Sequence, residues 1–152
     1  MGYILKNNGL TIYKTIIDAA DIKNMGSLPI LLNGPTPQDL NGLVFLPLSA
    51  TLRQINNTQG YNFPAQAHPT IQDSGNYFFI WEELLTDQLP DIYVYQALYI
   101  QGEHQITTIK LTSNYYALKQ GNQFMLTTQN GADSNTGNGQ VIVTIAGYLT
   151  TV

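Results

Sequence analysis

Alternation of apolar and polar residues is the dominant pattern along this chain, and residues 140–152 form one of its long alternating segments. Apolar residues recur at every second position on one side of this segment, while the other side is more polar; the first set is Val141, Val143, Ile145 and Leu149, and the second is Thr144, Tyr148 and Thr150. A period of two places successive side chains on opposite faces of an extended strand. The pattern therefore predicts a long strand with one face in a hydrophobic core.

A second long alternating segment covers residues 43–55. One side of it carries Val44, Leu46, Leu48, Ala50 and Leu52, and the other carries Pro47, Ser49, Thr51 and Arg53. We predict a strand in which Val44, Leu46, Leu48 and Leu52 point into the core together. Pro47 has no N–H to donate to a neighbouring strand, so the strand should lie at a sheet edge, or be bulged or bent there.

Shorter strand patterns fill much of the remaining chain. Turn residues separate segments rich in β-branched and aromatic residues, which predict strands at 3–6, 10–17, 28–32, 77–82, 92–100, 105–111 and 124–128. Residues 18–25 predict one short helix, with Asp18 as its N-cap, Asp21 in its first turn and Gly26 at its end. Eight to ten strands with one helix fit an all-β fold, a jelly-roll-like antiparallel β-sandwich, formed as a single domain by residues 1–152.

Two polar segments, 56–75 and 130–139, are predicted to be exposed loops. The first is unusually long for an irregular loop in a compact domain. It contains Tyr61 and Phe63, which lie two positions apart and would point to the same side of an extended segment. Either these rings contact a partner or another subunit, or they fold back onto their own sandwich.

Composition narrows the classes of partner. Charged residues make up 11% of the chain, against about a quarter in a typical domain. The net charge is −4 with only six Lys and Arg residues, which gives no basic patch for nucleic acid and favours neutral contacts, such as carbohydrate or neighbouring subunits. There are no cysteines, so disulfides and thiolate metal sites are excluded. No apolar run is long enough to span a membrane and no signal peptide is recognisable, so we expect synthesis in a cytoplasm.

Catalytic motifs are absent from the sequence: there is no glycine-rich phosphate loop, nucleophile elbow or metalloprotease motif. His68 and His104 lie in or beside predicted loops, and neither has a second ligand at metal spacing, so solvent-facing histidines are favoured over a metal pair. Asp133 could join Asn130 and Asn135 around a calcium ion, but the segment lacks the acidic spacing of a calcium loop. We predict no catalytic, cofactor-binding or metal-binding residues.

Two pairs of acidic residues could in principle act as acid–base pairs, but their positions fit other roles. Asp18 and Asp21 fit a helix cap and first turn better than an acid–base pair. Glu82 and Glu83 are neighbours at the end of a predicted strand, where adjacent side chains point to opposite faces, so they cannot act together.

The ten tyrosines point to contact surfaces more strongly than the histidines and acidic residues point to catalysis or metal binding. Tyr93, Tyr95 and Tyr99 would lie on one face of the predicted strand at 92–100. A tyrosine offers a rigid apolar ring with a hydroxyl, which suits interfaces and sugar faces. These three side chains either cover the sheet or part of the core, or form a subunit interface, with a sugar platform as the third alternative.

The layout of the chain also resembles a known group of proteins. Residues 15–25 form a predicted strand that ends in a short helix, Ser27-Leu28-Pro29-Ile30-Leu31-Leu32 follows, and near the end an N-G-A-D-x-x-T-G-N-G loop precedes Val141-Ile142-Val143-Thr144-Ile145. This arrangement, over most of the chain, resembles small jelly-roll proteins of tailed bacteriophage particles, which occur as head decoration, head-fibre and tail modules. The resemblance implies a β-sandwich, frequent trimers and a structural role, and it transfers no catalytic residues.

Taken together, the sequence predicts a non-enzymatic structural component of a bacteriophage virion, made in the host bacterial cytoplasm. The expected partners are further copies of the chain, with a trimer favoured, other phage structural proteins and a host surface glycan. One alternative is a receptor- or carbohydrate-binding β-sandwich module whose site is the 56–75 loop. Another is a β-sandwich enzyme, but a cupin needs clustered histidines that are missing, and a glycan hydrolase needs two facing carboxylates that no pattern supports.

Overall fold

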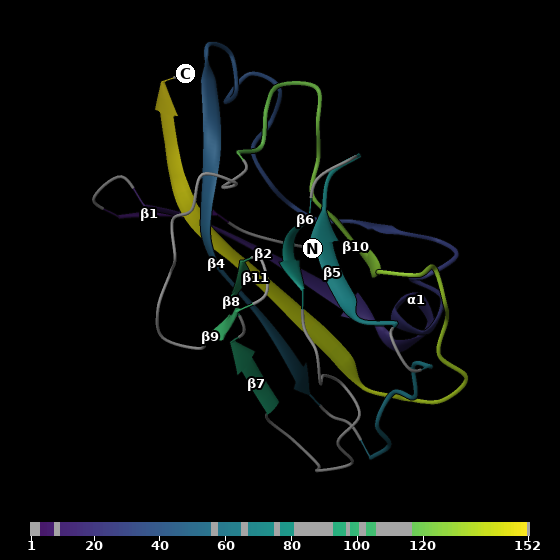
Figure 1. Cartoon of the computed structure of the whole chain (residues 1–152). Coiled ribbons are helices and arrows are strands. Elements are labelled where there is room, and N and C mark those ends of the chain that lie inside the picture. Colours follow the sequence, from purple (N-terminus) through teal and green to yellow (C-terminus); the bar gives the residue numbers. More distant parts are fainter. Residues whose placement is uncertain are drawn as a thin grey trace.

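The computed structural model describes residues 4–7, 10–55, 58–64, 67–74, 77–80, 93–96, 98–100, 103–105 and 117–151. Strands dominate this part of the chain, and its one helix, α1 (Ala19–Lys23), is short (Figure 1).

Two antiparallel sheets contain most of the strands. The five-stranded sheet has the order β1 (Ile4–Asn7), β2 (Leu10–Asp18), β11 (Gln140–Thr151), β4 (Leu43–Ile55) and β7 (Tyr93–Gln96). The four-stranded sheet has the order β3 (Ile30–Leu31), β10 (Met125–Thr128), β5 (Pro69–Gln72) and β6 (Tyr77–Ile80). A separate ribbon pairs β8 (Leu98–Ile100) with β9 (Glu103–Gln105).

The strand pairs nest as in a jelly roll. Strand β2 pairs with β11, β3 with β10, β4 with β7, and β5 with β6, all antiparallel. This nesting arises when one long antiparallel ribbon rolls up, and it divides eight strands between two packed sheets. The predicted jelly-roll-like β-sandwich is therefore confirmed. The predicted number of eight to ten strands is wrong, since the described residues alone form eleven strands, several of them very short.

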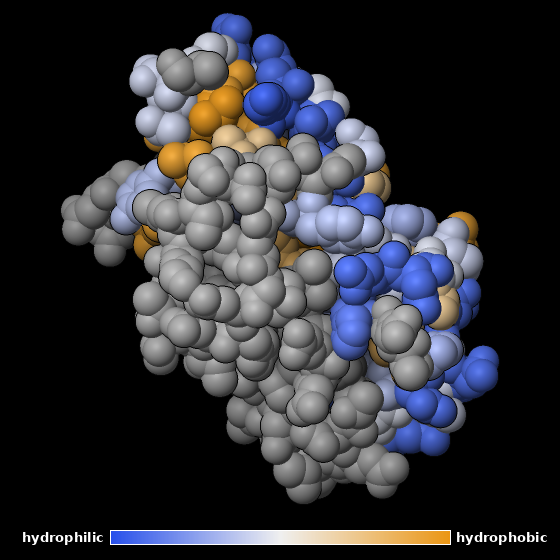
Figure 2. Space-filling view, viewed as in Figure 1, coloured by the Kyte–Doolittle hydropathy of each residue, from blue (hydrophilic) through white to orange (hydrophobic). Residues whose placement is uncertain are grey.

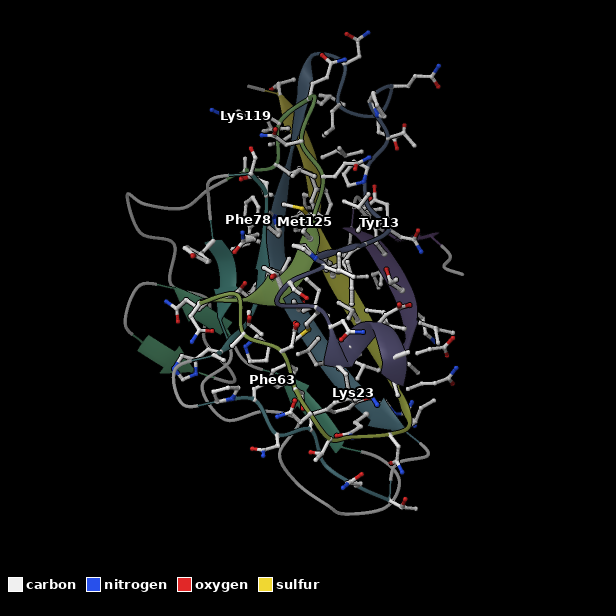
Figure 3. The ribbon with its side chains drawn as sticks, turned by 90° about the vertical axis from the view of Figure 1, so that its right-hand side faces the viewer. Tyr13, Lys23, Phe63, Phe78, Lys119 and Met125 are labelled. Carbon is white, nitrogen blue, oxygen red and sulfur yellow. The ribbon has the colours of Figure 1, made fainter. Side chains whose placement is uncertain are left out.

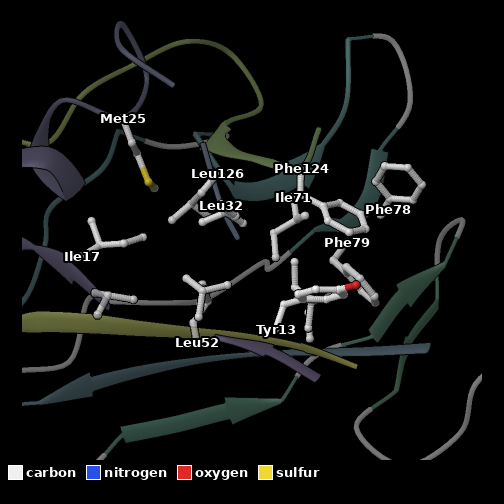
Figure 4. Close-up of a cluster of buried hydrophobic side chains, with 14 of the residues drawn as sticks. Tyr13, Ile17, Met25, Leu32, Leu52, Ile71, Phe78, Phe79, Phe124 and Leu126 are labelled. Atoms are coloured by element: carbon white, nitrogen blue, oxygen red, sulfur yellow. The ribbon is translucent and has the colours of Figure 1, made fainter. Parts of the chain in front are cut away.

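The core lies between the two sheets. Figure 4 shows side chains from the four-stranded layer, such as Leu126 and Ile71, meeting Ile17 and Leu52 from the five-stranded layer. A chain of edge-to-face rings crosses the same space, with centroids 5.4 Å apart for Tyr13–Phe45, 5.8 Å for Phe45–Phe124 and 5.2 Å for Phe124–Phe78. Aromatic rings favour such edge-to-face contacts. In Figure 3, Phe78 and Met125 lie to one side of Tyr13, with the teal strands beyond them.

Strand β11 is the central strand of the five-stranded sheet, and its predicted inner face is confirmed. Val141, Val143 and Ile145 are buried, with at most 1% of each side chain exposed. Leu149 is partly buried and packs against the same core. The strand pairs with β2 on one side and with β4 on the other, which explains why such a long alternating segment is stable.

Strand β4 contains the predicted irregularity. Ala146 pairs with Ser49 and Gly147 pairs with Pro47, so Leu48 is the extra residue of a β-bulge. The predicted inner face is correct after the bulge, where Ala50 and Leu52 are fully buried. It is wrong before the bulge: Phe45 and Pro47 are buried there, while Val44, Leu46 and Leu48 are only partly buried. One extra residue exchanges the two faces of a strand, because the side-chain period is two.

The helix begins where the sequence predicts, but the Asp18 side chain makes a different contact from the one predicted. Asp18 occupies the N-cap position of α1, yet its side chain does not cap the helix; instead, Oδ1 accepts a hydrogen bond of 2.8 Å from Gln140 Nε2. Asp21 lies in the first turn, as predicted. The helix ends at Asn24 rather than at Gly26. An added Cβ at Gly26 would overlap the carbonyl group of Ala132, so this glycine serves a close approach between backbones.

Candidate functional site

Segment 129–139 connects β10 to β11 and bridges two other parts of the chain. On one side, Ser27 donates to Asp133 twice, from its backbone N to Oδ1 at 2.8 Å and from Oγ to Oδ2 at 2.6 Å. These two hydrogen bonds hold the pKa of the Asp133 carboxyl below its ordinary value of 3.8. The backbone N of Ser134 also donates to the carbonyl oxygen of Lys23 at 2.8 Å. The segment is therefore tied to the turn after α1.

On its other side, segment 129–139 holds residues 58–62. The backbone N atoms of Thr58 and Gln59 both donate to Asn138 Oδ1, at 2.7 and 3.1 Å, and Asn138 Nδ2 donates to Thr58 Oγ1. The buried Ser134 Oγ accepts from the backbone N of Asn62 at 2.8 Å. Both segments were predicted to be exposed loops. Ser134 and Gly137 are buried, and residues 69–72 form β5, so that prediction is wrong for these parts.

Tyr61 lies in the core of its own sandwich rather than on an open loop. Only 1% of the residue is exposed, and its hydroxyl donates to the carbonyl oxygen of Gly139 at 3.3 Å. Gly137, at φ 118°, leaves room for the ring, because a Cβ there would overlap it. Burial, followed by the negative charge of Asp18, raises the pKa of Tyr61 to about 12. Phe63 stacks on Tyr61 with centroids 6.3 Å apart and is partly buried against the core.

Tyr61 and Phe63 thus take the second of the two predicted alternatives, in which they fold back onto their own sandwich. A partner contact through Tyr61 would require this segment to leave the core. The other predicted interface residues, Tyr93, Tyr95 and Tyr99, belong to β7 and β8, whose side chains lie outside the described residues. Their role stays a prediction.

No metal centre is assembled within the described ranges, where no group of three or more His, Cys, Asp or Glu residues could hold an ion. Both oxygens of Asp133 accept from Ser27, and Asn130 Oδ1 accepts from the backbone N of Ala132. This arrangement engages Asp133 and Asn130, two of the three side chains that the calcium hypothesis required. His68 is partly buried and its carbonyl oxygen accepts from Gln129, while the side chain of His104 lies outside the described residues. Glu82 and Glu83 also lie outside them.

The sheet surface that faces away from the core offers a different kind of site. Strands β2, β11 and β4 place side chains there in transverse rows, and we call this surface the outer face. Its rows, read from β2 through β11 to β4, are Asp18–Gln140–Ile55, Ile16–Ile142–Arg53, Lys14–Thr144–Thr51, Ile12–Ala146–Ser49 and Leu10–Tyr148–Leu46.

The outside of an antiparallel sheet is commonly polar, and the middle row of the outer face, Lys14–Thr144–Thr51, is polar, but the rows on either side of it carry apolar residues. Ile16 is 41% exposed and Tyr148 is 39% exposed, while Ile142 is 8% exposed between its neighbours. Ile12 and Leu46 are partly exposed in the adjoining rows. Figure 2 views the molecule from the side of the four-stranded sheet, so it does not show the outer face; the hydrophobic residues at the top of this view lie where β4 begins and β11 ends.

Sequence reasoning did not single out this face. The sequence gives one indication that the outer face is partly apolar. The segments that form β2 and β11 carry bulky apolar residues at even as well as odd positions, as at Ile16 and Ile142. The pattern shows that both faces are apolar, but it does not say which one meets the second sheet.

No protein family matches this chain, and neither do any curated proteins or solved structures. Within the described part of the chain, no helix is both long and apolar enough to cross a membrane.

Proposed function

We propose that this protein is a non-enzymatic structural component of a bacteriophage virion, assembled as a homotrimer and made in the host bacterial cytoplasm. Head decoration, head-fibre and tail attachment modules all belong to this class. The resemblance in layout to phage jelly-roll proteins suggests the class. The observation that carries the assembly is the exposed apolar part of the outer face, where Leu10, Tyr148 and Leu46 form one row across three strands and Tyr148 is 39% exposed.

The physical argument concerns solubility and exposed apolar surface. Only 11% of the residues are charged, so few charges keep free copies apart. Contiguous exposed apolar surface on a folded domain usually marks an interaction site. A component of a particle can have both a low charge content and an exposed apolar surface. Assembly buries that surface, and it leaves few free copies in solution that could aggregate.

The receptor- or carbohydrate-binding alternative has less support. Its candidate site was segment 56–75, but Tyr61 is covered by its own sandwich and stacks on Phe63. A sugar platform needs an aromatic face that is open to the ligand. We therefore do not advance this alternative as a second function.

Two measurements test the proposal. Light scattering or sedimentation of the purified protein at tens of micromolar should give the mass of a trimer, and immunogold labelling of intact phage particles should place the protein on the virion. A stable monomer would contradict the assembly, and particles that lack the protein would contradict the virion role.

A further inference from the structure

We infer that Asn41 is a site of spontaneous deamidation, in which the backbone nitrogen of Gly42 attacks the Asn41 side chain. The product is an aspartate or an isoaspartate in the turn that precedes β4. The inference does not depend on the proposed function, because it uses only the geometry of a single chain.

Asn–Gly pairs recur along this sequence. The asparagines that a glycine follows directly are Asn8, Asn33, Asn41, Asn130 and Asn138. Glycine is the most permissive second residue for this reaction, because it has no side chain to obstruct its own nitrogen and its backbone adopts many conformations. Asn8 and Gly9 lie outside the described residues, and the other pairs lie within them.

The reaction forms one bond and breaks another. Loss of the proton from the Gly42 N–H lets this nitrogen bond to Cγ of Asn41, and the bond from Cγ to Nδ2 then breaks. Nδ2 takes a proton from water and leaves as ammonia, so that a cyclic succinimide remains. Water then opens the ring at either of its carbonyl carbons, which gives aspartate or isoaspartate with a new carboxylate. The step requires only water and is not a redox reaction.

The turn at Asn41 leaves both reacting groups accessible. Asn41 and Gly42 are exposed, and a Cβ placed on Gly42 would have nothing within 4 Å beyond its chain neighbours. Backbone hydrogen bonds of 3.2 Å hold the turn, from Leu43 N to the Leu40 carbonyl and from Asn41 N to the Gln38 carbonyl. Within the described part of the chain, no hydrogen bond engages the Asn41 side chain or the Gly42 N–H. The side chain can therefore rotate until Cγ meets the nitrogen.

Asn138 has the opposite environment. Its Oδ1 accepts from the backbone N atoms of Thr58 and Gln59 at 2.7 and 3.1 Å, and its Nδ2 donates to Thr58 Oγ1 at 2.7 Å. These bonds must break before Cγ can turn toward the nitrogen of Gly139. Each hydrogen bond lost on the way to the transition state slows the reaction roughly 2–10-fold.

Asn33 is also held in place, although by fewer side-chain contacts. Its Nδ2 donates to the carbonyl oxygen of Lys14 at 2.8 Å, and its backbone N donates to Thr15 Oγ1 at 2.9 Å. The next residue, Gly34, lies against the ring of Phe124, since an added Cβ there would be 3.1 Å from that ring. The attacking nitrogen and the side chain are therefore both restrained by β2 and the core.

Asn130 is restrained at the nucleophile as well as at the side chain. Its Oδ1 accepts from the backbone N of Ala132 at 3.1 Å. The nitrogen of Gly131, which would attack, donates to the carbonyl oxygen of Thr128 at 3.3 Å. An N–H that already donates a hydrogen bond gives up its proton less readily. Among the described pairs, the reaction should therefore be fastest at Asn41.

Deamidation at this position would change both charge and backbone. Either product adds one negative charge to a chain whose net charge is −4. An isoaspartate also lengthens the backbone by one carbon, directly before Leu43, which pairs with Thr151 at the end of β11. Both changes fall at the edge of the turn, where they can be measured without unfolding the sandwich.

The experiment compares the folded protein with the same protein unfolded in guanidinium chloride. The unfolded chain reports the intrinsic rate of each pair, and peptide mass spectrometry at mildly alkaline pH follows every asparagine over time. In the folded protein, Asn41 should react within about threefold of its unfolded rate, since no hydrogen bond must break. Asn138, with its three side-chain bonds, should be slowed at least about tenfold.

Two variants separate the site from its protection, and circular dichroism should show that both are folded. Asn41→Gln lengthens the side chain, which disfavours ring closure, and should abolish the reaction at this position alone. Thr58→Val removes the hydroxyl that holds Asn138 Nδ2 and keeps the branched shape of an exposed side chain. It should speed deamidation of Asn138 roughly 2–10-fold in the folded protein and leave Asn41 unchanged.

Three results would overturn the inference. The first is protection of Asn41 in the folded protein as strong as that of Asn138. The second is a faster reaction at Asn33, Asn130 or Asn138 than at Asn41. The third is a product that contains aspartate without isoaspartate, because direct hydrolysis of the amide, rather than attack by Gly42, would then be the reaction.

Discussion

Replacing Tyr61 by alanine tests whether segment 56–75 is a lid on its own core or a surface for partners. Tyr61 is 1% exposed, and a buried tyrosine removes about 150–250 Å² from water. At about 25 cal/mol per Å², that burial is worth roughly 4–6 kcal/mol as an upper estimate, and truncations of large core aromatics cost about 3–5 kcal/mol. We therefore expect Tyr61→Ala to lower the free energy of unfolding by about 4 kcal/mol.

The matched control is Tyr61→Phe, which keeps the ring and removes the hydroxyl. The hydroxyl's hydrogen bond to Gly139 is long, at 3.3 Å, so its loss should cost less than about 1 kcal/mol. Urea unfolding at pH 7, at one protein concentration for all variants, measures both losses, and light scattering reports assembly. Should Tyr61→Ala cost less than about 1 kcal/mol while assembly weakens, the segment would be a partner surface and the reasoning would be refuted.

Three further outcomes follow from individual contacts. Val143→Ala, at 1% exposure in the middle of β11, should lower the free energy of unfolding by about 2 kcal/mol in urea, and a loss below about 0.5 kcal/mol would mean that its facing is wrong. Gly26→Ala should lower the melting temperature, because its Cβ would overlap the carbonyl of Ala132; an unchanged temperature would show that the turn after α1 can move freely. The Asp133 carboxyl has a lowered pKa in the folded state, so it stabilises the fold above its unfolded value of 3.8, and that stabilisation is lost as the pH falls through the lower folded value. The stability difference between the natural protein and Asp133→Asn should therefore shrink below about pH 4 in pH-dependent unfolding, and a difference that is the same at pH 7 and at pH 2 would exclude a linkage through this carboxyl.

Local sequence patterns predicted where the helix and strands lie better than they predicted which distant segments contact each other. The period of two located β11 and its inner residues Val141 and Val143, because a strand in contact with a second sheet must bury alternate side chains. Asp18 marked the start of the helix, since this residue type favours the cap position. Segment 58–62 could not be placed in the same way. Its anchors, among them the hydrogen bonds to Asn138, join residues about 80 positions apart, and no local pattern carries that information.

The bulge in β4 connects the one local irregularity that the sequence revealed to the surface that it did not. Leu46 and Leu52 have the same parity, so without a bulge both would point into the core, as the alternation predicted. The extra residue at Leu48 turns Leu46 outward, where it joins the row of Tyr148, and turns Phe45 inward, where it meets Tyr13. The sequence places a proline next to this point, where a regular ladder would need an N–H donor. A backbone irregularity of one residue thus moves a core-type side chain to the outer face and extends its apolar rows toward the end of the sheet. The charge of Arg53, on the other side of the bulge, remains on that face because Leu52 and Ala50 keep the original phase.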